Sequence, residues 1–315
     1  MMRTARLLFH RLRSCGPGCG ARLSVFLAVL CLSGFLLHPE DLSGQSEGGV
    51  VSVLESFDLS SDGGVRVELP GQLREISGLA VSEDGRIFGH NDEFGRVFEI
   101  DVSTGSIKKF FNVGRLAVPG DFEGLAVAGE RFFLVSSAGD LVEFREGENG
   151  SSMGYQVYPL GLGRLCEMEG LAFDESREAL LLPCKTPRIR RLEDHLVVFS
   201  VPLTSMRPDP EPRIFLPLKE VDSAGLGKNF QPSSIEIHPE SGSLFLVAAR
   251  QEAIVELSSE GEILATKELK KKRHPQPEGI TFLPDGRLVI ADEGQGGRGA
   301  LTLYPRAHGS GKEAP

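Results

Sequence analysis

A six-residue motif recurs along the chain at nearly constant intervals, and it constrains the fold more than any other feature. Its clearest copies read D-F-E-G-L-A at Asp121–Ala126 and E-M-E-G-L-A at Glu167–Ala172. Related copies read E-I-S-G-L-A, Q-P-S-S-I-E and Q-P-E-G-I-T, at Glu75–Ala80, Gln231–Glu236 and Gln276–Thr281. The third residues of the five copies are separated by 46, 46, 64 and 45 residues. Self-similarity at such a period indicates a repeat architecture.

Each copy begins an apolar segment of strand length, and further such segments follow it between Gly- and Pro-containing turns. Four antiparallel strands in about 45 residues are typical of a β-propeller blade, whereas a β-sandwich would not give this period. We therefore predict an all-β propeller of five blades. The last copy has no sequence left for a fourth strand, so a strand from Val50–Leu59 or Val65–Leu69 is expected to complete that blade. Six blades are the alternative, if Val50–Leu69 begins a blade of its own. The 64-residue interval predicts an insertion, divided between Lys185–His195 and Thr204–Pro212.

The N-terminal residues differ in composition from the rest of the chain. Five arginines precede the apolar run Leu23–Leu37, which is typical of a secretory signal peptide or a signal anchor. We predict a signal over residues 1–38, a linker over 39–49, the propeller over 50–305 and a disordered tail over 306–315. The propeller is then exported to the periplasmic or extracellular side, as a membrane-anchored or secreted monomer. A net charge of −10 argues against a nucleic-acid partner, because phosphate binding requires a basic surface.

The motif divides into a packing part and an acidic part. Successive side chains on a strand alternate between faces, so Asp121, Glu123 and Leu125 are predicted to share one face. Gly124 and Ala126 then lie on the other face, where small residues allow neighbouring blades to approach closely. Packing does not explain the acids, which stand where the innermost strands are expected to converge on a central channel.

These acids predict a calcium site at the channel mouth. Crowded carboxylates raise each other's pKa unless a cation neutralises them, and oxygen ligands in flexible geometry favour Ca²⁺ over Zn²⁺. The first choice of ligands is Glu123, Glu169 and Glu278. The second choices are other motif acids and polar residues at the ends of second strands, namely Asp121, Glu167, Glu75, Asn91, Asp92 and Asp292. The alternative is an ion-pair network with the basic residues expected near the same rim, which are Arg74, Arg164, Lys185 and Arg250.

Two cysteines, Cys166 and Cys184, lie in the predicted propeller. If a hairpin pairs Phe173 with Ala179, these cysteines stand nearly opposite each other. A cross-strand disulfide in an oxidising compartment and a pair of reduced thiols are both open. No G-x-S-x-G, H-E-x-x-H or P-loop motif is present, and the glycine-rich run at 294–299 does not match a dinucleotide fingerprint.

Several phased segments of the chain resemble the SdiA-regulated, YjiK-like family. They are the three G-L-A copies, F-Q-P-S-S-I-E-I-H-P, and Q-P-E-G-I-T-F-L-P-D-G-R-L-V-I-A-D-E; the likeness covers about residues 50–305. The resemblance implies a five-bladed propeller with bound calcium, distantly related to NHL-repeat proteins and often membrane-anchored, but no known activity. The fourth copy departs from the acidic pattern at Gln231 and Ser233, which puts metal ligation from that blade in doubt.

Three functions follow from these features. The leading hypothesis is an extracytoplasmic, membrane-associated, calcium-binding propeller that acts as a binding or scaffold module, with a small-molecule or protein ligand at the channel mouth. The alternative is a metal-dependent hydrolase, lactonase- or phosphoesterase-like, in which the ion polarises an ester oxygen and a His or Asp of the rim acts as base. His90, His238 and His274 lie near strand ends and are candidates for that acid–base role. The third is a protein-binding propeller that needs no calcium.

Overall fold

The computed structural model of the chain describes residues 52–60, 62–226 and 229–307. The chain divides into two units, Met1–Gly48 and Gly49–Pro315, and all described residues belong to the second. The predicted signal or anchor, the linker and most of the predicted tail lie outside the described residues. Among the helices of the described part, none is long and apolar enough to cross a membrane.

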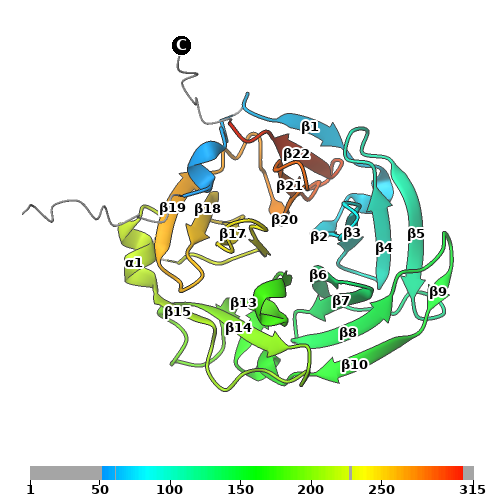
Figure 1. Cartoon of the computed structure of the whole chain (residues 1–315), viewed down its shortest axis with the longest axis horizontal. Coiled ribbons are helices and arrows are strands. Elements are labelled where there is room, and N and C mark those ends of the chain that lie inside the picture. Colours follow the sequence, from blue (N-terminus) through cyan, green and yellow to red (C-terminus); the bar gives the residue numbers. More distant parts are fainter. Residues whose placement is uncertain (1–51, 61, 227–228, 308–315) are drawn as a thin grey trace, which may run out of the picture. The chain divides into compact units, whose positions relative to one another are not determined.

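Five mainly antiparallel sheets surround one axis, and we number them blade 1 to blade 5 in chain order (Figure 1). Each motif copy lies at the start of an innermost strand. These strands are β2 (Ile76–Val81), β6 (Phe122–Ala128), β11 (Cys166–Met168) with β12 (Ala172–Asp174), β16 (Ser234–Ile237) and β20 (Pro277–Phe282). The predicted five-bladed propeller is confirmed.

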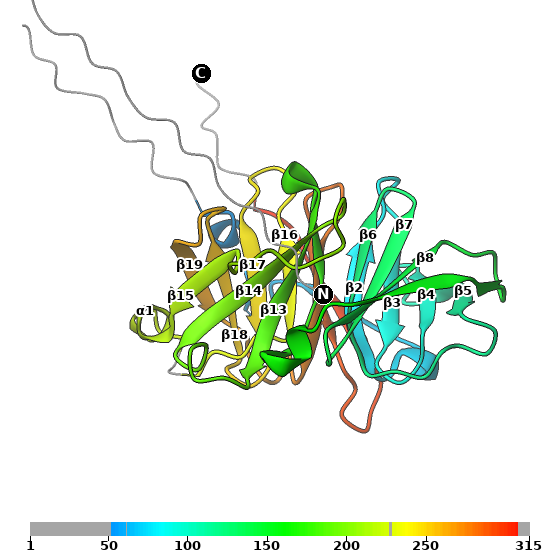
Figure 2. The same ribbon diagram turned by 90° about the horizontal axis from the view of Figure 1, so that it is seen from below.

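The other strands of each blade follow outward from the axis, as the side view of the blades shows (Figure 2). The second strands are β3 (Ile87–Asn91), β7 (Arg131–Ser136), β13 (Ala179–Pro187), β17 (Leu244–Ala248) and β21 (Leu288–Asp292). The third strands are β4 (Arg96–Ile100), β8 (Asp140–Arg145), β14 (His195–Pro202), β18 (Ala253–Leu257) and β22 (Ala300–Tyr304). The fourth strands of blades 1 to 4 are β5 (Ile107–Val113), β10 (Tyr155–Pro159), β15 (Ile214–Pro217) and β19 (Ile263–Glu268). One short strand was not predicted: β9 (Ser152–Met153) runs parallel to β5 at the outer edge of blade 1.

Blade 5 takes its fourth strand from the N-terminal side of the propeller. β1 (Val65–Glu68) pairs antiparallel with β22, with Val67 opposite Leu301. This confirms the prediction that an N-terminal strand closes the ring, and the six-blade alternative is wrong.

The strand predicted over Val50–Leu59 is wrong in its described part. This segment forms a single 3₁₀ turn, η1 (Leu54–Ser56), and one isolated bridge to blade 5. The cause is the buried carboxylate of Glu256 in blade 4, which accepts hydrogen bonds from the backbone N–H groups of Val53 and Leu54 at 3.1 and 2.8 Å. Backbone donors held by a side chain are not available to a sheet ladder.

Short helical segments occupy connections between strands. They are η2 (Gly71–Leu73), η3 (Leu162–Arg164), η4 (Glu175–Arg177) and α1 (Leu218–Ser223). The insertion predicted for the third repeat is found between β13 and β14 and between β14 and β15, but α1 before blade 4 adds to it and was not predicted. β13 is the longest of the second strands, and β11 pairs with its last residues, Cys184–Pro187.

The motif glycines lie where neighbouring innermost strands meet. A Cβ atom on Gly124 would stand 2.5 Å from the backbone of Gly170 and Leu171 in the next blade, and one on Gly170 would stand 3.0 Å from the Cα of Ser234. The Gly170 N–H also donates to the carbonyl of Glu123 at 2.6 Å. Small residues therefore permit backbone contact between blades, as the motif predicted.

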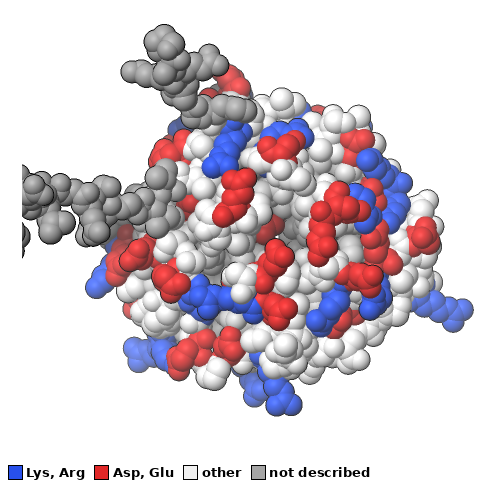
Figure 3. Space-filling model, in the orientation of Figure 1, with Lys and Arg blue, Asp and Glu red and all other residues white. Residues whose placement is uncertain are grey.

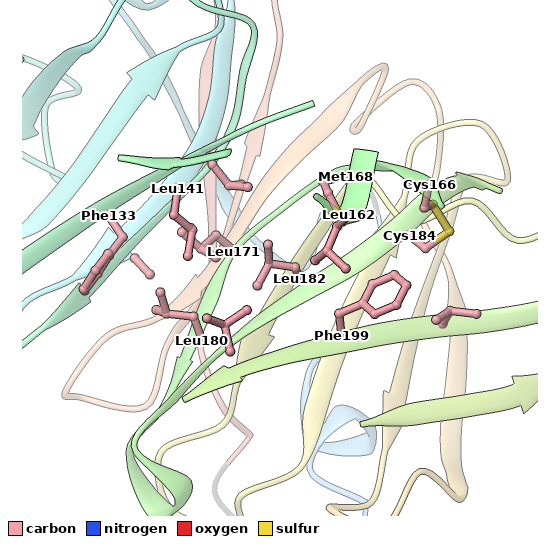
Figure 4. Packing of buried hydrophobic residues seen from close by; sticks show 14 of the residues in the cluster. Phe133, Leu141, Leu162, Cys166, Met168, Leu171, Leu180, Leu182, Cys184 and Phe199 are labelled. Carbon is pink, nitrogen blue, oxygen red and sulfur yellow. A yellow bond between two sulfur atoms is a disulfide. The ribbon is translucent and has the colours of Figure 1, made fainter. Parts of the chain in front are cut away.

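The hydrophobic core lies between the sheets, and Figure 4 shows its part between blades 2 and 3. Phe133, Leu171 and Leu182 are buried there, and a disulfide joins Cys166 to Cys184 at one side of the cluster. Of the two alternatives left open for these cysteines, the disulfide is the one present. The hairpin register differs by one residue from the prediction, since Ala179 pairs with Asp174 rather than with Phe173.

Candidate functional site

In four blades the regular strand pairing is interrupted at the third residue of the motif. In β2, β6 and β20 the pairing register shifts around Ser77, Glu123 and Glu278. In blade 3 the innermost strand is interrupted between β11 and β12, where Glu169 stands. Such irregularities re-aim a side chain. The strict alternation predicted for Asp121, Glu123 and Leu125 is therefore wrong at the acid.

Glu123, Glu169 and Glu278, which we call the acidic trio, come together around one lysine. The Lys185 ammonium, on β13, donates to Glu169 Oε1 at 2.5 Å. Its charge also acts on Glu123 and Glu278. The three first-choice residues therefore act on one another electrostatically, and Lys185, a basic residue of the predicted ion-pair network, is paired with one of them. Figure 3 shows one face of the propeller, on which acidic and basic side chains are interspersed around the centre.

The protonation of the trio is strongly affected by its surroundings. Burial raises the pKa of Glu278 to about 8, against the opposing charge of Lys185. Burial also raises the pKa of Glu123, and the charges of Glu169 and Asp121 raise it further. The pKa of Glu169 is raised by burial in the same way, with Lys185 opposing. Burial lowers the pKa of Lys185, but the three carboxylates outweigh that effect and the net shift is upward. One ammonium thus does not fully offset three buried acids.

Each carboxylate of the trio has a different hydrogen-bond partner. Glu123 accepts from the Ser77 hydroxyl at 3.3 Å, Glu278 accepts from the Gln276 amide at 2.8 Å, and Glu169 is held by Lys185. Over residues 52–60, 62–226 and 229–307, no three His, Cys, Asp or Glu side chains stand close enough to ligate one metal ion together.

Several buried polar atoms at this end of the innermost strands have no hydrogen-bond partner. They are Glu169 Oε2, His90 Nε2, Asn91 Oδ1 and Asp92 Oδ1. Glu169 is only 3% exposed, so water does not satisfy its second oxygen easily. An unpaired carboxylate oxygen beside two further carboxylates fits a cation that prefers oxygen ligands.

A second group of acids, which we call the rim acids, consists of Glu75, Asp92, Glu93 and Glu293. Glu75 is paired with Arg74 at 2.8 Å. Burial raises the pKa of Asp92, and the charges of Glu75 and Glu93 raise it further. The pKa of Glu293 is also raised by burial, then by Asp92 and Glu75. Glu93 and Glu293 were not among the predicted ligands, although each directly follows a predicted one in sequence.

Asp121 and Glu167 lie next to the trio in sequence but do not join it through any hydrogen bond. The Asp121 carboxylate is exposed and accepts from the Ser137 hydroxyl. Glu167 pairs with Thr186 across β11 and β13, and its charge acts on Glu169.

Asp292 lies in a different environment from the one predicted. Its buried carboxylate bonds to His274 Nδ1 at 2.9 Å and is paired with Arg66 of β1 at 3.3 Å. His274 in turn contacts the Tyr304 hydroxyl through Nε2 at 2.6 Å. This network joins β1 to β21 and β22, and so supports the closure of the ring.

Blade 4 contributes no acid to the centre, in agreement with its sequence. Ser233 donates to the carbonyl of Pro277 in blade 5 at 2.6 Å, and Gln231 accepts from Arg250 at 3.0 Å. The other two candidate histidines are buried: His90 at 0% and His238 at 2% exposure. Burial lowers the pKa of His90 to about 4, so the ring is neutral at neutral pH.

These features define a five-bladed β-propeller with a cluster of buried acids, one of them paired with a lysine, at the start of its innermost strands. A profile of the SdiA-regulated family matches residues 215–302, which confirms the predicted resemblance over β15 to β22. No curated protein matches the sequence.

Solved structures with the same fold include several enzymes. The Myxococcus xanthus glutaminyl cyclase is 13% identical, with a TM-score of 0.50 over 76% of this chain and 94% of that one. A luciferin-regenerating enzyme is 11% identical, with a TM-score of 0.49 over 77% and 96%. A gluconolactonase from Xanthomonas campestris is 12% identical, with a TM-score of 0.44 over 77% and 90%. Identities this low show a shared fold alone, because propellers carry many unrelated functions.

Proposed function

We propose that the chain is an extracytoplasmic, membrane-associated propeller that binds calcium at its axis and acts as a binding module. The observation that carries this proposal is the acidic trio. Three largely buried acids from blades 2, 3 and 5 have one lysine nearby, which is paired with Glu169, and one of their oxygens has no partner. Buried like charges are costly unless cations neutralise them.

The donor set suits calcium rather than zinc. The trio offers carboxylate oxygens without a histidine or thiolate among them, and Ca²⁺ accepts six to eight such ligands in flexible geometry. Glu123, Glu169 and Glu278 would hold the ion, and their side chains would have to move toward it, because no three such side chains of the described residues stand within ligating distance of one ion in this structure. Calcium would supply neutralisation of the three charges and a link between the three blades.

The placement of the histidines disfavours hydrolysis with a histidine base, and it does not bear on an aspartate base. His90, His238 and His274 are all buried, so none is available as a base at the surface of the site. The rim acids act on the trio from nearby, since Asp92 affects the pKa of Glu123 and Glu293 affects that of Glu278. A ligand of this face would accordingly carry positive charge.

Calorimetric titration of the full-length chain with CaCl₂ tests the metal part of the proposal. We expect one saturable site, and we expect Glu278→Gln to weaken it by about tenfold or more, the loss that corresponds to 1.4 kcal/mol. The matched control is Glu130→Gln, since the Glu130 side chain is 83% exposed. No binding by the wild-type chain, or equal binding by Glu278→Gln, would refute the proposal.

Export is supported by two separate features. The arginine-rich flank and the apolar run Leu23–Leu37 are typical of a signal, and the Cys166–Cys184 disulfide suits an oxidising compartment. A reporter enzyme that is active only outside the cytoplasm, fused after Pro315, should be active. Activity of a fused cytoplasmic reporter instead would contradict export.

A further inference from the structure

The loop 114–121 leads from β5, on the outer side of blade 1, to β6 at the centre of blade 2 (Figure 1). It displays a leucine to solvent. Leu116 is 88% exposed, the highest value among the exposed large apolar residues of 52–60, 62–226 and 229–307. The next residue, Ala117, is only 5% exposed. Burying the larger side chain would remove more apolar surface from water, so this loop is arranged against the hydrophobic effect.

The backbone of Ala117 is strained. Its φ of 60° lies in the left-handed region, which is unfavourable for a residue with a Cβ atom. The turn that contains it is closed by the Val118 N–H, which donates to the carbonyl of Val113 at 2.8 Å. Strained conformations of this kind persist only where the surrounding structure holds them, and they cluster at functional sites. Here the strained turn buries Ala117 and leaves Leu116 in solvent.

A second loop, 92–95 between β3 and β4, holds the first loop in place. The Gly95 N–H donates to the carbonyl of Val118 at 2.7 Å, and Phe94 forms an isolated bridge with Pro119. Phe94 is 44% exposed, and Pro119 is exposed as well. The paired loops therefore present apolar side chains on a backbone that is fixed by hydrogen bonds.

Acidic residues flank these apolar side chains. Glu93 directly precedes Phe94, Asp121 ends the other loop, and both acids are exposed. The Gly120 N–H donates to the carbonyl of Glu93 at 3.1 Å, which brings the two acids to the same edge of the paired loops. Arg115 is the one base in the sequence of the two loops. An apolar surface with this charge attracts a basic partner and repels a membrane of anionic lipids.

We propose that Phe94, Leu116 and Pro119, which we call the apolar platform, form a docking surface for a peptide segment of another protein that combines apolar and basic side chains. This inference rests on the proposed binding role but not on calcium. Leu116 would supply most of the apolar contact, because it has the most surface to remove from water. Glu93 and Asp121 would pair with lysine or arginine side chains of the peptide. A surface that is already ordered loses little conformational entropy on binding.

Fluorescence polarisation of a short labelled peptide of leucine, glycine and lysine, titrated with the full-length chain, tests the proposal. We expect saturable binding by the wild type, and we expect Leu116→Ser to weaken it by about tenfold or more. Glu93→Gln should weaken binding and reduce its dependence on salt. The control is Val65→Ser, because Val65 is also an exposed apolar residue, at 66%, but lies on β1 of blade 5; its affinity should equal that of the wild type.

Two further probes identify the occupant of the apolar platform. They are a matched peptide with glutamate in place of every lysine, and vesicles of phosphatidylcholine. Equal binding of the two peptides would overturn the basic partner. Binding to the vesicles but not to the lysine peptide would show that the platform docks on a membrane instead, which also overturns the proposal. Equal binding of the lysine peptide by the wild type and by Leu116→Ser would overturn it as well.

Calcium titration of the same chains separates this inference from the proposed metal site. A wild type that binds calcium but not the lysine peptide overturns the platform and leaves the metal site standing. A wild type that binds the peptide through Leu116 but binds no calcium supports the platform and refutes the metal site. Urea unfolding of Leu116→Ser excludes a role of Leu116 in folding: its midpoint should equal that of the wild type, and a lower midpoint would show that Leu116 packs inward, contrary to the proposal.

Discussion

Single residues determine how closely the innermost strands approach each other. Gly124 is the clearest case, because the atoms nearest to its missing Cβ belong to the backbone of Gly170 and Leu171. Backbone cannot rotate away as a flexible side chain can, so any side chain here must move a whole blade.

Gly124→Ala is expected to destabilise the propeller by about 3 kcal/mol, the upper part of the range for overpacking a core. Gly154→Ala is the control, since no heavy atom lies within 4 Å of its added Cβ, and it should change stability by less than about 1 kcal/mol. Urea unfolding followed by circular dichroism measures both. Equal midpoints for the two variants would contradict the backbone contact between blades.

Glu236 gives the propeller a pH-dependent stability outside the acidic trio. Burial raises its pKa to about 7, although the Ile237 N–H and the Thr281 hydroxyl donate to its carboxylate and oppose the shift. The folded chain therefore holds this proton over a range in which the unfolded chain, with a pKa of 4.5, has lost it. Stability from this group is present below pH 4.5 and is lost as the pH rises to 7.

The Glu236→Gln variant should remove this dependence. At pH 8 it should be more stable than the wild type by up to about 3 kcal/mol, and at pH 4.5 the two should be nearly equal. Urea unfolding at both pH values measures the difference. If the wild type is more stable than Glu236→Gln at pH 8, burial does not raise the pKa of Glu236 as described.

The composition of the trio was predictable, but the partners of each acid were not. Glu123, Glu169 and Glu278 share one position of a repeat, so the period alone places them together. Asp292 ends the second strand of blade 5, β21, and its carboxylate bonds to His274 and Arg66 instead of joining the trio. Those partners meet it only after β1 has closed the ring, a long-range event without a local sequence signal.

Elements in this fold depart from regular geometry at the positions that matter for the site. The register shifts in β6 and β20 turn Glu123 and Glu278 away from strict alternation. A periodic reading of the sequence cannot detect them, because a bulge adds one residue without changing the apolar pattern on either side. Strand existence and order were therefore predicted well, while side-chain direction at the motif acids was not.

The disulfide fixes the two strands that carry the cationic and anionic partners of blade 3. Cys166 lies on β11, which ends directly before Glu169. Cys184 and Lys185 are consecutive residues of β13. Reduction should lower stability by about 3 kcal/mol, given the separation of 18 residues, and should weaken calcium binding. Thermal unfolding with and without dithiothreitol measures the first effect, and coincident transitions would contradict it.

The whole ring depends on contacts between its two chain ends. β1 closes blade 5, and η1 is held against blade 4 by the carboxylate of Glu256. That side chain also accepts from the hydroxyls of Ser52 and Ser243, at 2.6 and 2.8 Å. Ser52, Val53 and Leu54, at the N-terminal start of the described residues, are thereby part of the propeller fold.

Glu256→Ala should cost about 3 kcal/mol, because it leaves buried backbone N–H groups of Val53 and Leu54 without acceptors. Glu55→Ala is the control, since Glu55 is 64% exposed and only paired with Lys267 at the surface; surface pairs contribute less than about 1 kcal/mol. Urea unfolding measures both changes. Equal effects of the two substitutions would show that Glu256 does not hold the N-terminal segment.

The central claim is that the acids at the axis of the propeller bind calcium. It is tested most directly by a crystal structure of the full-length chain grown with calcium, with anomalous scattering used to locate the ion. The account predicts one ion bonded to Glu123, Glu169 and Glu278. A calcium-saturated crystal with no ion at the trio would contradict it.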